Sequence, residues 1–307
     1  MREIKIKNGR YEALILDQGA ILCSFSVDGH DVVLGFENIE DNIESDSYLG
    51  QIVGPYANRI CDAVYSDENG EHRVEKNDGK NHLHSGNRNY GWKTWGVKEI
   101  TESSVTLTLY SPESYGYPGN QEVCVKYSLS LEGVLRLDYS IKGDKKCPLN
   151  PTNHAFFNLS GSGDIRDTVV TMDADEYLEV DSTLIPTEIK SVESTDFDFR
   201  SPKALRERRN GAYDHCFVIK EGGKVRAENK EYALEMTTSL PGMQLYTGEF
   251  LNRKEKGKNG TVLSPFTGFC METEYYPDFP NRPDFKGFWL DEKNEYVSWT
   301  EYRLIKK

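Results

Sequence analysis

Polar and apolar residues alternate along most of this chain, and that period of two restricts it to folds built from half-buried strands. Nine segments either alternate or are rich in β-branched and aromatic residues: 4–7, 12–16, 105–110, 123–131, 135–141, 167–172, 232–238, 243–250 and 296–305. Turn dipeptides such as Asp28-Gly29, Asn69-Gly70 and Pro118-Gly119 favour hairpins between antiparallel strands. We therefore expect an all-β fold.

Only one segment carries clear helix signals. Residues 201–206 combine a serine N-cap, a proline at the first helical position and a short run of helix formers, which predicts one short surface helix. Many strands without long helices between them favour a sandwich or barrel over a doubly wound sheet. Because no repeat, low-complexity tract or linker divides the chain, we expect one large antiparallel β-sandwich domain over residues 1–307.

The charge balance narrows the possible partners. The 307 residues include 50 acidic and 37 basic side chains, which gives a formal net charge of −13. Nucleic acids and anionic membranes both attract basic surfaces, so we expect neither as a partner.

The amino terminus and the cysteines bear on localisation. Residues 1–7 alternate charged and apolar side chains, unlike a secretory signal, and no stretch reaches the roughly 18 apolar residues of a membrane-spanning helix. Without a C-x-x-C pair, the cysteines match neither a zinc knuckle nor a disulfide scaffold. We therefore expect a soluble cytoplasmic protein with reduced thiols at Cys23, Cys61, Cys124, Cys147, Cys216 and Cys270.

Histidines gather in segments that the strand pattern does not explain. A hydrogen-bonded histidine at a strand end accounts for each of them singly. His82 and His84 are two residues apart and would share one face of a strand, as metal ligands can, but no third ligand is assignable, so we expect no metal site. Neither a phosphate-binding glycine loop nor a G-x-S-x-G elbow is present, so nucleotide cofactors and a serine nucleophile lack support.

Two glutamates near the carboxyl end are more informative. Glu272 and Glu274 are two residues apart at a predicted strand end, so they would point to the same face. A solvated strand edge would also explain them. However, residues 267–270 are uncharged and 277–281 form a rigid, aromatic-bearing loop. Such surroundings raise a carboxyl pKa by desolvation and favour a general base.

Seven short motifs follow one another in order along nearly the whole chain, at residues 54–60, 81–95, 111–119, 153–159, 213–217, 241–248 and 272–274. Residues 153–159 are similar to N-H-x-Y-F-N-L, and residues 272–274 are similar to E-T-Q. By these motifs the chain resembles the aldose 1-epimerase or galactose mutarotase family. The resemblance implies the large antiparallel supersandwich of galactose mutarotase-like proteins, with a groove for a sugar.

The resemblance also implies an activity, the interconversion of α and β anomers of an aldohexose such as galactose or glucose. Glu272 would be the base and His154 the acid, and no cofactor is implied. The base removes the C1 hydroxyl proton while the acid protonates the ring oxygen, so the ring opens and recloses on the other face. The substrate would be a monosaccharide or a reducing-end sugar. Its hydroxyls and ring oxygen would contact Arg59, His84, Asp214, Gln244 and Asn58.

Several residues depart from the family pattern or fit more than one role. Glu274 replaces the glutamine of E-T-Q, and like-charge repulsion from it could raise the pKa of Glu272. Other departures occur at residues 54–56, 83–86 and 247–250, so the preferred aldose is left open, as is the oligomeric state.

Four aromatic residues could offer an apolar face to a sugar, although core packing explains them better: Trp92, Trp95, Phe156 and Phe279.

Two other classes of function stay open. A glycoside hydrolase would use two carboxylates across the scissile bond, and Glu272 with Glu274 or Asp214 could supply them. A non-catalytic sugar-binding protein or transcription partner could use the same groove. That class ranks last, because binding alone would not need both His154 and Glu272.

Overall fold

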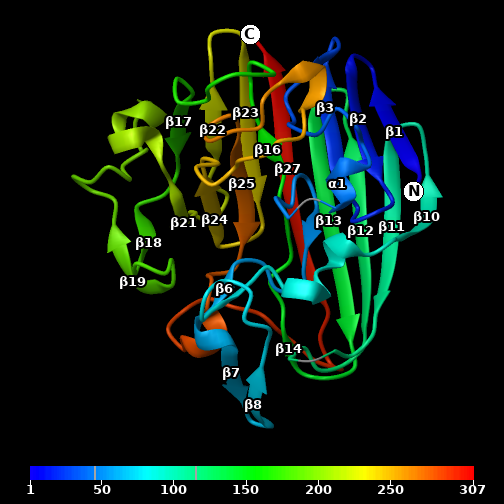
Figure 1. Cartoon of the computed structure of the whole chain (residues 1–307), viewed down its shortest axis with the longest axis vertical. Helices are drawn as coiled ribbons and strands as arrows, with labels where there is room; N and C mark the ends of the chain where they lie inside the picture. Colours follow the sequence, from blue (N-terminus) through cyan, green and yellow to red (C-terminus); the bar gives the residue numbers. More distant parts are fainter. Residues whose placement is uncertain (45, 115) are drawn as a thin grey trace.

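The computed structural model describes residues 1–44, 46–114 and 116–307, and Figure 1 shows that strands dominate them. The named strand pairs are antiparallel, as the hairpin signals predict. The largest sheet has nine strands, in the order β10 (Gly96–Ile100), β11 (Ser104–Ser111), β12 (Gln121–Leu129), β13 (Val134–Gly143), β27 (Tyr296–Lys306), β23 (Tyr232–Thr238), β22 (Val225–Glu228), β17 (Val169–Met172) and β20 (Lys203–Ala204).

A six-stranded and a four-stranded sheet complete the main architecture. The six-stranded sheet has the order β16 (Phe156–Phe157), β25 (Phe269–Glu274), β24 (Gly242–Tyr246), β21 (Asp214–Val218), β18 (Glu176–Val180) and β19 (Pro186–Ser191). The four-stranded sheet runs β1 (Glu3–Asn8), β2 (Tyr11–Leu16), β3 (Leu22–Val27) and β4 (His30–Asp31). Two-stranded pairs are β14 (Cys147–Pro148) with β26 (Trp289–Leu290), β15 (Thr152–Asn153) with β5 (Ile52–Val53), β6 (Arg59–Ile60) with β9 (His82–Leu83), and β7 (Val64–Asp67) with β8 (Gly70–Arg73).

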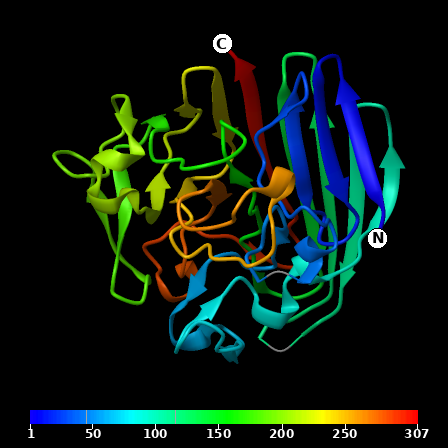
Figure 2. The same ribbon diagram turned by 45° about the horizontal axis from the view of Figure 1, so that its top comes forward.

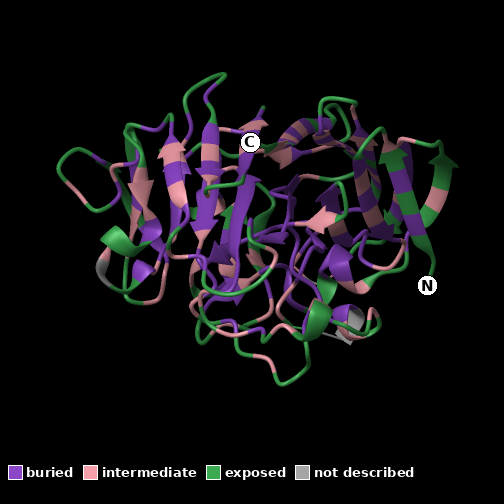
Figure 3. Ribbon diagram, turned by 90° about the horizontal axis from the view of Figure 1, so that it is seen from above, coloured by how far each residue is buried: buried purple, intermediate pink, exposed green. Residues whose placement is uncertain are grey.

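The sheets pack face to face around one large apolar core. Strands β1, β2 and β3 lie across β11, β12 and β27, as Figure 2 shows. In β12 alternate residues are buried, so its apolar side chains enter the core while polar ones face outward. Each fully buried Val, Leu, Ile or Phe stabilises such a core by about 1.5–3 kcal/mol. Figure 3 shows that burial follows the central strands, whereas exposed residues gather in the outer loops.

Strand β25 connects this core to the other face of its sheet. Phe269 and Met271 belong to the main core, and the Thr273 Oγ1 lies 2.5 Å from the Thr300 Oγ1 of β27. The side chains of Glu272 and Glu274 therefore point to the opposite face, as their spacing predicts. All six residues of β25 are buried, so both carboxyls are removed from bulk solvent.

The all-β prediction is confirmed, and each of the nine predicted segments contains a strand. Three segments are too long: the strand in 123–131 stops at Leu129, the strand in 243–250 stops at Tyr246, and the strand in 167–172 begins only at Val169. The second ends early because Gly248 has a φ of 68° and turns the chain away from β24.

The prediction of a helix over residues 201–206 is wrong. Strand β20 pairs with Val169 and Val170 at the sheet edge, and only a 3₁₀ turn, Leu205–Glu207, follows. The Glu207 carboxylate accepts a hydrogen bond from the Ala204 N–H, so edge pairing and this cap satisfy the backbone groups that a helix would have used. The single α-helix in the described residues is α1, the one-turn segment Asp41–Glu44.

Two further expectations from the sequence concern reduced cysteines and membrane-spanning helices. All six cysteines are free, four of them buried and two partly buried. Within the part of the chain that the structure describes, no helix has the length and apolarity required to cross a membrane.

The 111–119 motif contains Tyr115, which lies outside the described residues.

One buried amide ties the loop at residues 54–58 to the end of β25. The Asn150 Oδ1 accepts from the Tyr275 N–H at 2.7 Å, and its Nδ2 donates to the Tyr275 carbonyl at 3.2 Å. The backbone N–H of Asn150 donates to the Pro55 carbonyl, and its own carbonyl accepts from the Ala57 N–H. Asn150 is fully buried, so no solvent replaces these bonds.

We predict that Asn150→Ala lowers the free energy of unfolding by about 2–3 kcal/mol, because it leaves the buried Tyr275 N–H without an acceptor. Denaturant unfolding followed by fluorescence measures the effect. The matched control is Asn120→Ala, whose amide bonds Asp144 in an exposed loop and should cost much less. Equal effects of the two substitutions would contradict this account.

Candidate functional site

A cavity of about 280 Å³ opens on the face of the six-stranded sheet that carries Glu272. Residues from seven separate stretches of the chain surround it, and its lining mixes charged, amide, imidazole and aromatic groups. Such a concave, partly polar pocket is the usual form of a small-molecule site. The lining residues are Asp46, Ser47, Tyr48, Asn58, Arg59, Leu83, His84, His154, Phe156, Asp214, Gln244, Tyr246, Phe250, Leu251, Arg253 and Glu272.

The register of β21, β24 and β25 brings part of this lining together. Gln244 lies directly opposite Glu272, and Asp214 opposite Tyr246, so their side chains share one face of the sheet. The Gln244 Nε2 donates to the Asp214 Oδ1 at 2.5 Å. This bond fixes the amide so that its carbonyl oxygen stays available to a ligand.

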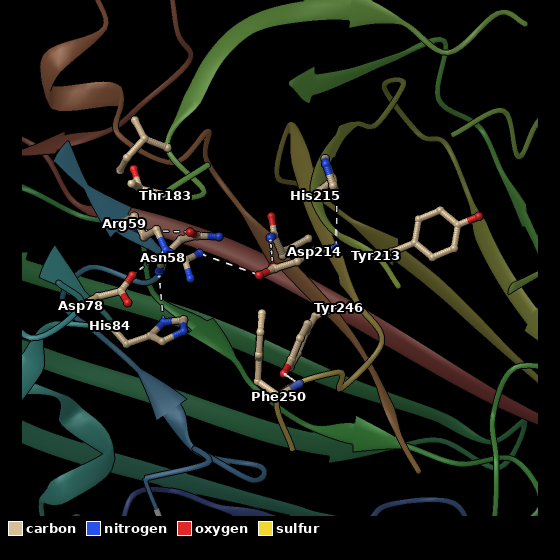
Figure 4. A network of polar contacts seen from close by, with 12 residues as sticks. Asn58, Arg59, Asp78, His84, Thr183, Tyr213, Asp214, His215, Tyr246 and Phe250 are labelled. Carbon is tan, nitrogen blue, oxygen red and sulfur yellow. Dashed lines mark hydrogen bonds and ion pairs between the residues drawn. The ribbon is translucent and has the colours of Figure 1, made fainter. Parts of the chain in front are cut away.

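Arg59, on the short strand β6, crosses the site between two carboxylates (Figure 4). Its Nε donates to the Asp78 Oδ2 at 2.8 Å, and its Nη1 lies 3.9 Å from the Asp214 Oδ2. Burial raises the pKa of Asp214, and the Arg59 charge opposes that rise. The guanidinium is thus oriented from both sides while its remaining N–H groups face the cavity.

His154 and Glu272 form the most buried contact of the site. The His154 Nε2 lies 3.5 Å from the Glu272 Oε2, and the two side chains are 6% and 3% exposed. Burial lowers the pKa of His154 to about 4. Burial also raises the pKa of Glu272 well above its ordinary value, and the charges of Glu274 and Asp214 raise it further. Burial thus disfavours the charged form of both groups, so the neutral imidazole beside the protonated carboxyl is favoured over the ion pair.

The hydrogen bonding of His84 determines which of its nitrogens carries a proton. Its Nδ1 accepts from the Asn58 backbone N–H at 3.1 Å, which leaves the proton of the neutral ring on Nε2. Burial lowers the pKa of His84 well below its ordinary value, so the ring stays neutral. His84 therefore presents an N–H donor to an oxygen acceptor in the cavity.

A metal ion fits this geometry poorly. Among the described residues, His84, His154 and Glu272 place one ligand atom each within 4.8 Å of one another. A metal would need a lone pair on His84, yet its Nδ1 lone pair is occupied and its Nε2 bears the proton. The three groups are better suited to hydrogen bonding and proton transfer.

The prediction that His82 and His84 share one face of a strand is wrong. Strand β9 ends at Leu83, and His84 adopts a left-handed φ of 51°, so its side chain turns toward the cavity. His82 instead hydrogen-bonds the Tyr117 hydroxyl at 2.7 Å and the Glu75 carbonyl. His82 therefore has a structural role away from this cavity.

The structure brings the other predicted site residues together. The seven that the sequence nominated line the one cavity: Asn58, Arg59, His84, His154, Asp214, Gln244 and Glu272. Glu274 shares the face of Glu272 but lies behind the cavity wall. Of the four aromatics considered, only Phe156 lines the cavity, whereas Trp95 and Phe279 belong to the core.

Several aromatic lining residues could not be singled out from the sequence. The Tyr48 ring lies 4.8 Å from His84 and 5.8 Å from His154, measured between centroids. Tyr48 has a left-handed φ of 56°, a conformation that concentrates at functional sites in non-glycine residues. Tyr246 and Phe250 stack at the cavity (Figure 4), and only their position within the 241–248 motif or beside it offered a signal.

Comparison with known proteins gives consistent matches. The sequence profile of the family described as aldose 1-epimerase matches residues 2–303. Human galactose mutarotase is 37% identical over 288 residues, which are 89% of this chain and 84% of that protein. An aldose 1-epimerase of Escherichia coli strain K12 is 32% identical over 316 residues, 95% of this chain and 91% of that protein.

Solved structures agree with these sequence matches. A GalM/aldose epimerase homologue from C. elegans superposes with a TM-score of 0.95 at 29% identity, covering 99% of both chains. A galactose 1-epimerase from Lactobacillus acidophilus gives a TM-score of 0.87 at 25% identity, covering 99% of this chain and 94% of that one.

We predict that the His154 imidazole stays neutral down to about pH 4, because burial disfavours its charged form. Histidine-selective NMR measures this as the pH at which the ring signals change, and a His154→Phe variant assigns them. Titration near the ordinary histidine value of about 6.5 would contradict the burial argument.

Proposed function

The chain belongs to the aldose 1-epimerase family, and on that premise we propose that it interconverts the α and β anomers of an aldohexose such as galactose or glucose. Glu272 acts as the base and His154 as the acid. The observation that carries this proposal is their buried contact at 3.5 Å on the wall of the cavity. General acid–base catalysis needs two groups of this kind within reach of one substrate.

The reaction requires two proton transfers that balance each other. Glu272 takes the proton of the C1 hydroxyl, the C1–O5 bond breaks, and His154 donates a proton to O5. The product is the open-chain aldehyde, which rotates about C1–C2. On closure O5 attacks C1 from the other face, His154 recovers its proton from O5, and Glu272 returns a proton to O1. Neither side chain is changed after one turnover.

A pair that holds one proton suits this sequence. The carboxylic acid with neutral imidazole and the carboxylate with imidazolium are two placements of the same proton. The reactive placement has the proton on His154, and the neutral placement is the resting one because burial disfavours the ion pair. Activity should therefore fall at low pH, where the pair gains a second proton, and at high pH, where it loses its only one.

The rest of the cavity supplies contacts for a sugar. Arg59 and the His84 Nε2–H donate to oxygens, whereas Asp214 and the Gln244 carbonyl accept from hydroxyls. A volume of about 280 Å³ has room for one pyranose ring. Asn58 uses its amide on Glu274 and on the Arg59 N–H, so its contribution is mainly to hold its neighbours in place.

The two alternative functions have less support. Glu274 does not line the cavity, so a hydrolase would have to pair Glu272 with Asp214. The Asp214 carboxylate is committed to Gln244 and faces Arg59, an arrangement that fits an acceptor better than a proton donor. A protein that only bound sugar would gain nothing from burying an acid and a base in contact.

The same proposal extends to domain organisation and compartment. We treat residues 1–307 as one domain, because the main core cluster contains residues from Ile4 to Leu304. Six free cysteines fit a reducing compartment such as the cytoplasm. A neutral sugar substrate also needs no basic surface, in keeping with the net charge of −13.

We predict that Glu272→Gln and His154→Asn each lower kcat for mutarotation by about 100-fold or more, because each removes one of the two proton-transferring groups. Polarimetry on freshly dissolved α-galactose and α-glucose measures the rate. Glu249→Gln is the matched control, since Glu249 is a partly exposed carboxylate outside the cavity lining.

Wild type that fails to accelerate mutarotation of any aldose over buffer would overturn the proposed activity. Release of a new reducing end from a glycoside, with the rate retained in His154→Asn, would instead support a hydrolase.

A further inference from the structure

Glu274 is a charged residue that the proposed reaction does not use. It is fully buried, lies two residues from Glu272 on the same strand face, and is separated from the cavity. Its Oε1 accepts from the Asn58 Nδ2 at 3.2 Å, whereas its Oε2 is buried without a hydrogen-bond partner among the described residues. Since a buried carboxyl is costly, its place directly behind the catalytic pair requires an explanation.

We propose that Glu274 is a positioning residue, which holds Asn58 in place and sets a second carboxyl beside Glu272 on the same strand face. This inference rests on the proposed function and adds a residue to it. It has two parts, one through hydrogen bonds and one through charge.

The hydrogen-bonded part runs from Glu274 through Asn58 to the cavity. Asn58 has a left-handed φ of 65°, a conformation that asparagine adopts readily, and its side chain and backbone bond three different residues. Its Nδ2 is held by Glu274, its Oδ1 accepts from the Arg59 N–H, and its own N–H donates to the His84 Nδ1. Glu274 thereby anchors the residue that orients Arg59 and sets the tautomer of His84.

The charge-based part follows from the polar and charged groups near the Glu274 and Glu272 carboxyls. Glu274 accepts the Asn58 hydrogen bond, which favours its ionised form, and the Arg59 charge acts in the same direction. The Glu272 Oε2 instead lies 3.5 Å from the His154 Nε2, on a ring that is neutral above about pH 4 and brings no positive charge. Glu274 therefore ionises first, and its charge then repels a second charge on Glu272.

The other charged and titratable groups around the two carboxyls do not reverse this order. Asp214 on β21 raises the pKa of both, and Arg59 lowers both. Gly242 on β24 lies opposite Glu274 and brings no side chain. Tyr56, whose hydroxyl is buried, and Tyr302, which bonds the Met271 carbonyl, stay neutral because burial raises the pKa of both phenols.

The consequence concerns activity at neutral pH. With His154 neutral, the pair has a proton to donate only while Glu272 keeps one. Without the Glu274 charge, Glu272 would lose its proton at lower pH and the pair would hold none. Glu274 thus extends the active form toward neutral and alkaline pH.

Two substitutions separate the two parts of the proposal. Glu274→Gln keeps an oxygen acceptor for Asn58 but removes the ionisable group. We expect the alkaline limb of the kcat/KM profile to move down by roughly one to two pH units, with KM near the wild-type value. Glu274→Leu removes the acceptor as well and should additionally raise KM. Glu249→Gln is the control, and its profile should match wild type.

A second measurement does not depend on turnover. ¹³C NMR of carboxyl-labelled glutamate, with Glu272→Gln to assign the signal, gives the titration of Glu272 in the free protein. We expect that titration to move down by the same interval in Glu274→Gln. An unchanged Glu272 titration would overturn the charge-based part even if the enzyme is active, and an unchanged KM in Glu274→Leu would overturn the anchoring part. If wild type shows no mutarotation, the proposed function fails while the NMR result still decides the effect of Glu274 on Glu272.

Discussion

The contact between the His154 Nε2 and the Glu272 Oε2 is the interaction on which the proposed chemistry depends. At 3.5 Å, with side chains that are 6% and 3% exposed, the two groups are less stable as opposite charges than they would be in water. Burial lowers the pKa of His154 and raises that of Glu272, so the two pKa values move toward the point at which one proton serves both groups. In the proposed reaction one proton on the pair leaves one group able to act as an acid and the other as a base. Anomer interconversion needs both roles in ring opening and again in ring closure.

The fold creates this contact by burying both faces of β25. Its Phe269 and Met271 belong to the main core, while Glu272 and Glu274 face the cavity side. A strand at an exposed edge would leave the same carboxyls solvated, with ordinary pKa values. Covering strands and loops that contribute Arg59, His84 and His154 remove water from that face, so the packing of the sheets controls the electrostatics of the site.

Periodicity in the sequence was sufficient to predict the strands and the common face of Glu272 and Glu274, because alternation is a local property. Periodicity was insufficient where pairing between distant segments determines the local structure. Residues 203–204, for example, join a sheet edge instead of starting a helix. His84 illustrates the same limit, since its left-handed backbone depends on the contact with Asn58. Tyr48 carried no local signal, because its place beside two imidazoles arises only from the three-dimensional fold.

The most direct test of the shared proton is a double-mutant cycle on the pair. The rates of anomer exchange for galactose and glucose, measured by NMR exchange spectroscopy on the anomeric protons, would be compared for wild type, Glu272→Gln, His154→Asn and the double variant. If the two side chains act as one unit, the double variant loses no more rate than the more damaged single variant. Losses that multiply in the double variant would show two independent groups and would contradict the account.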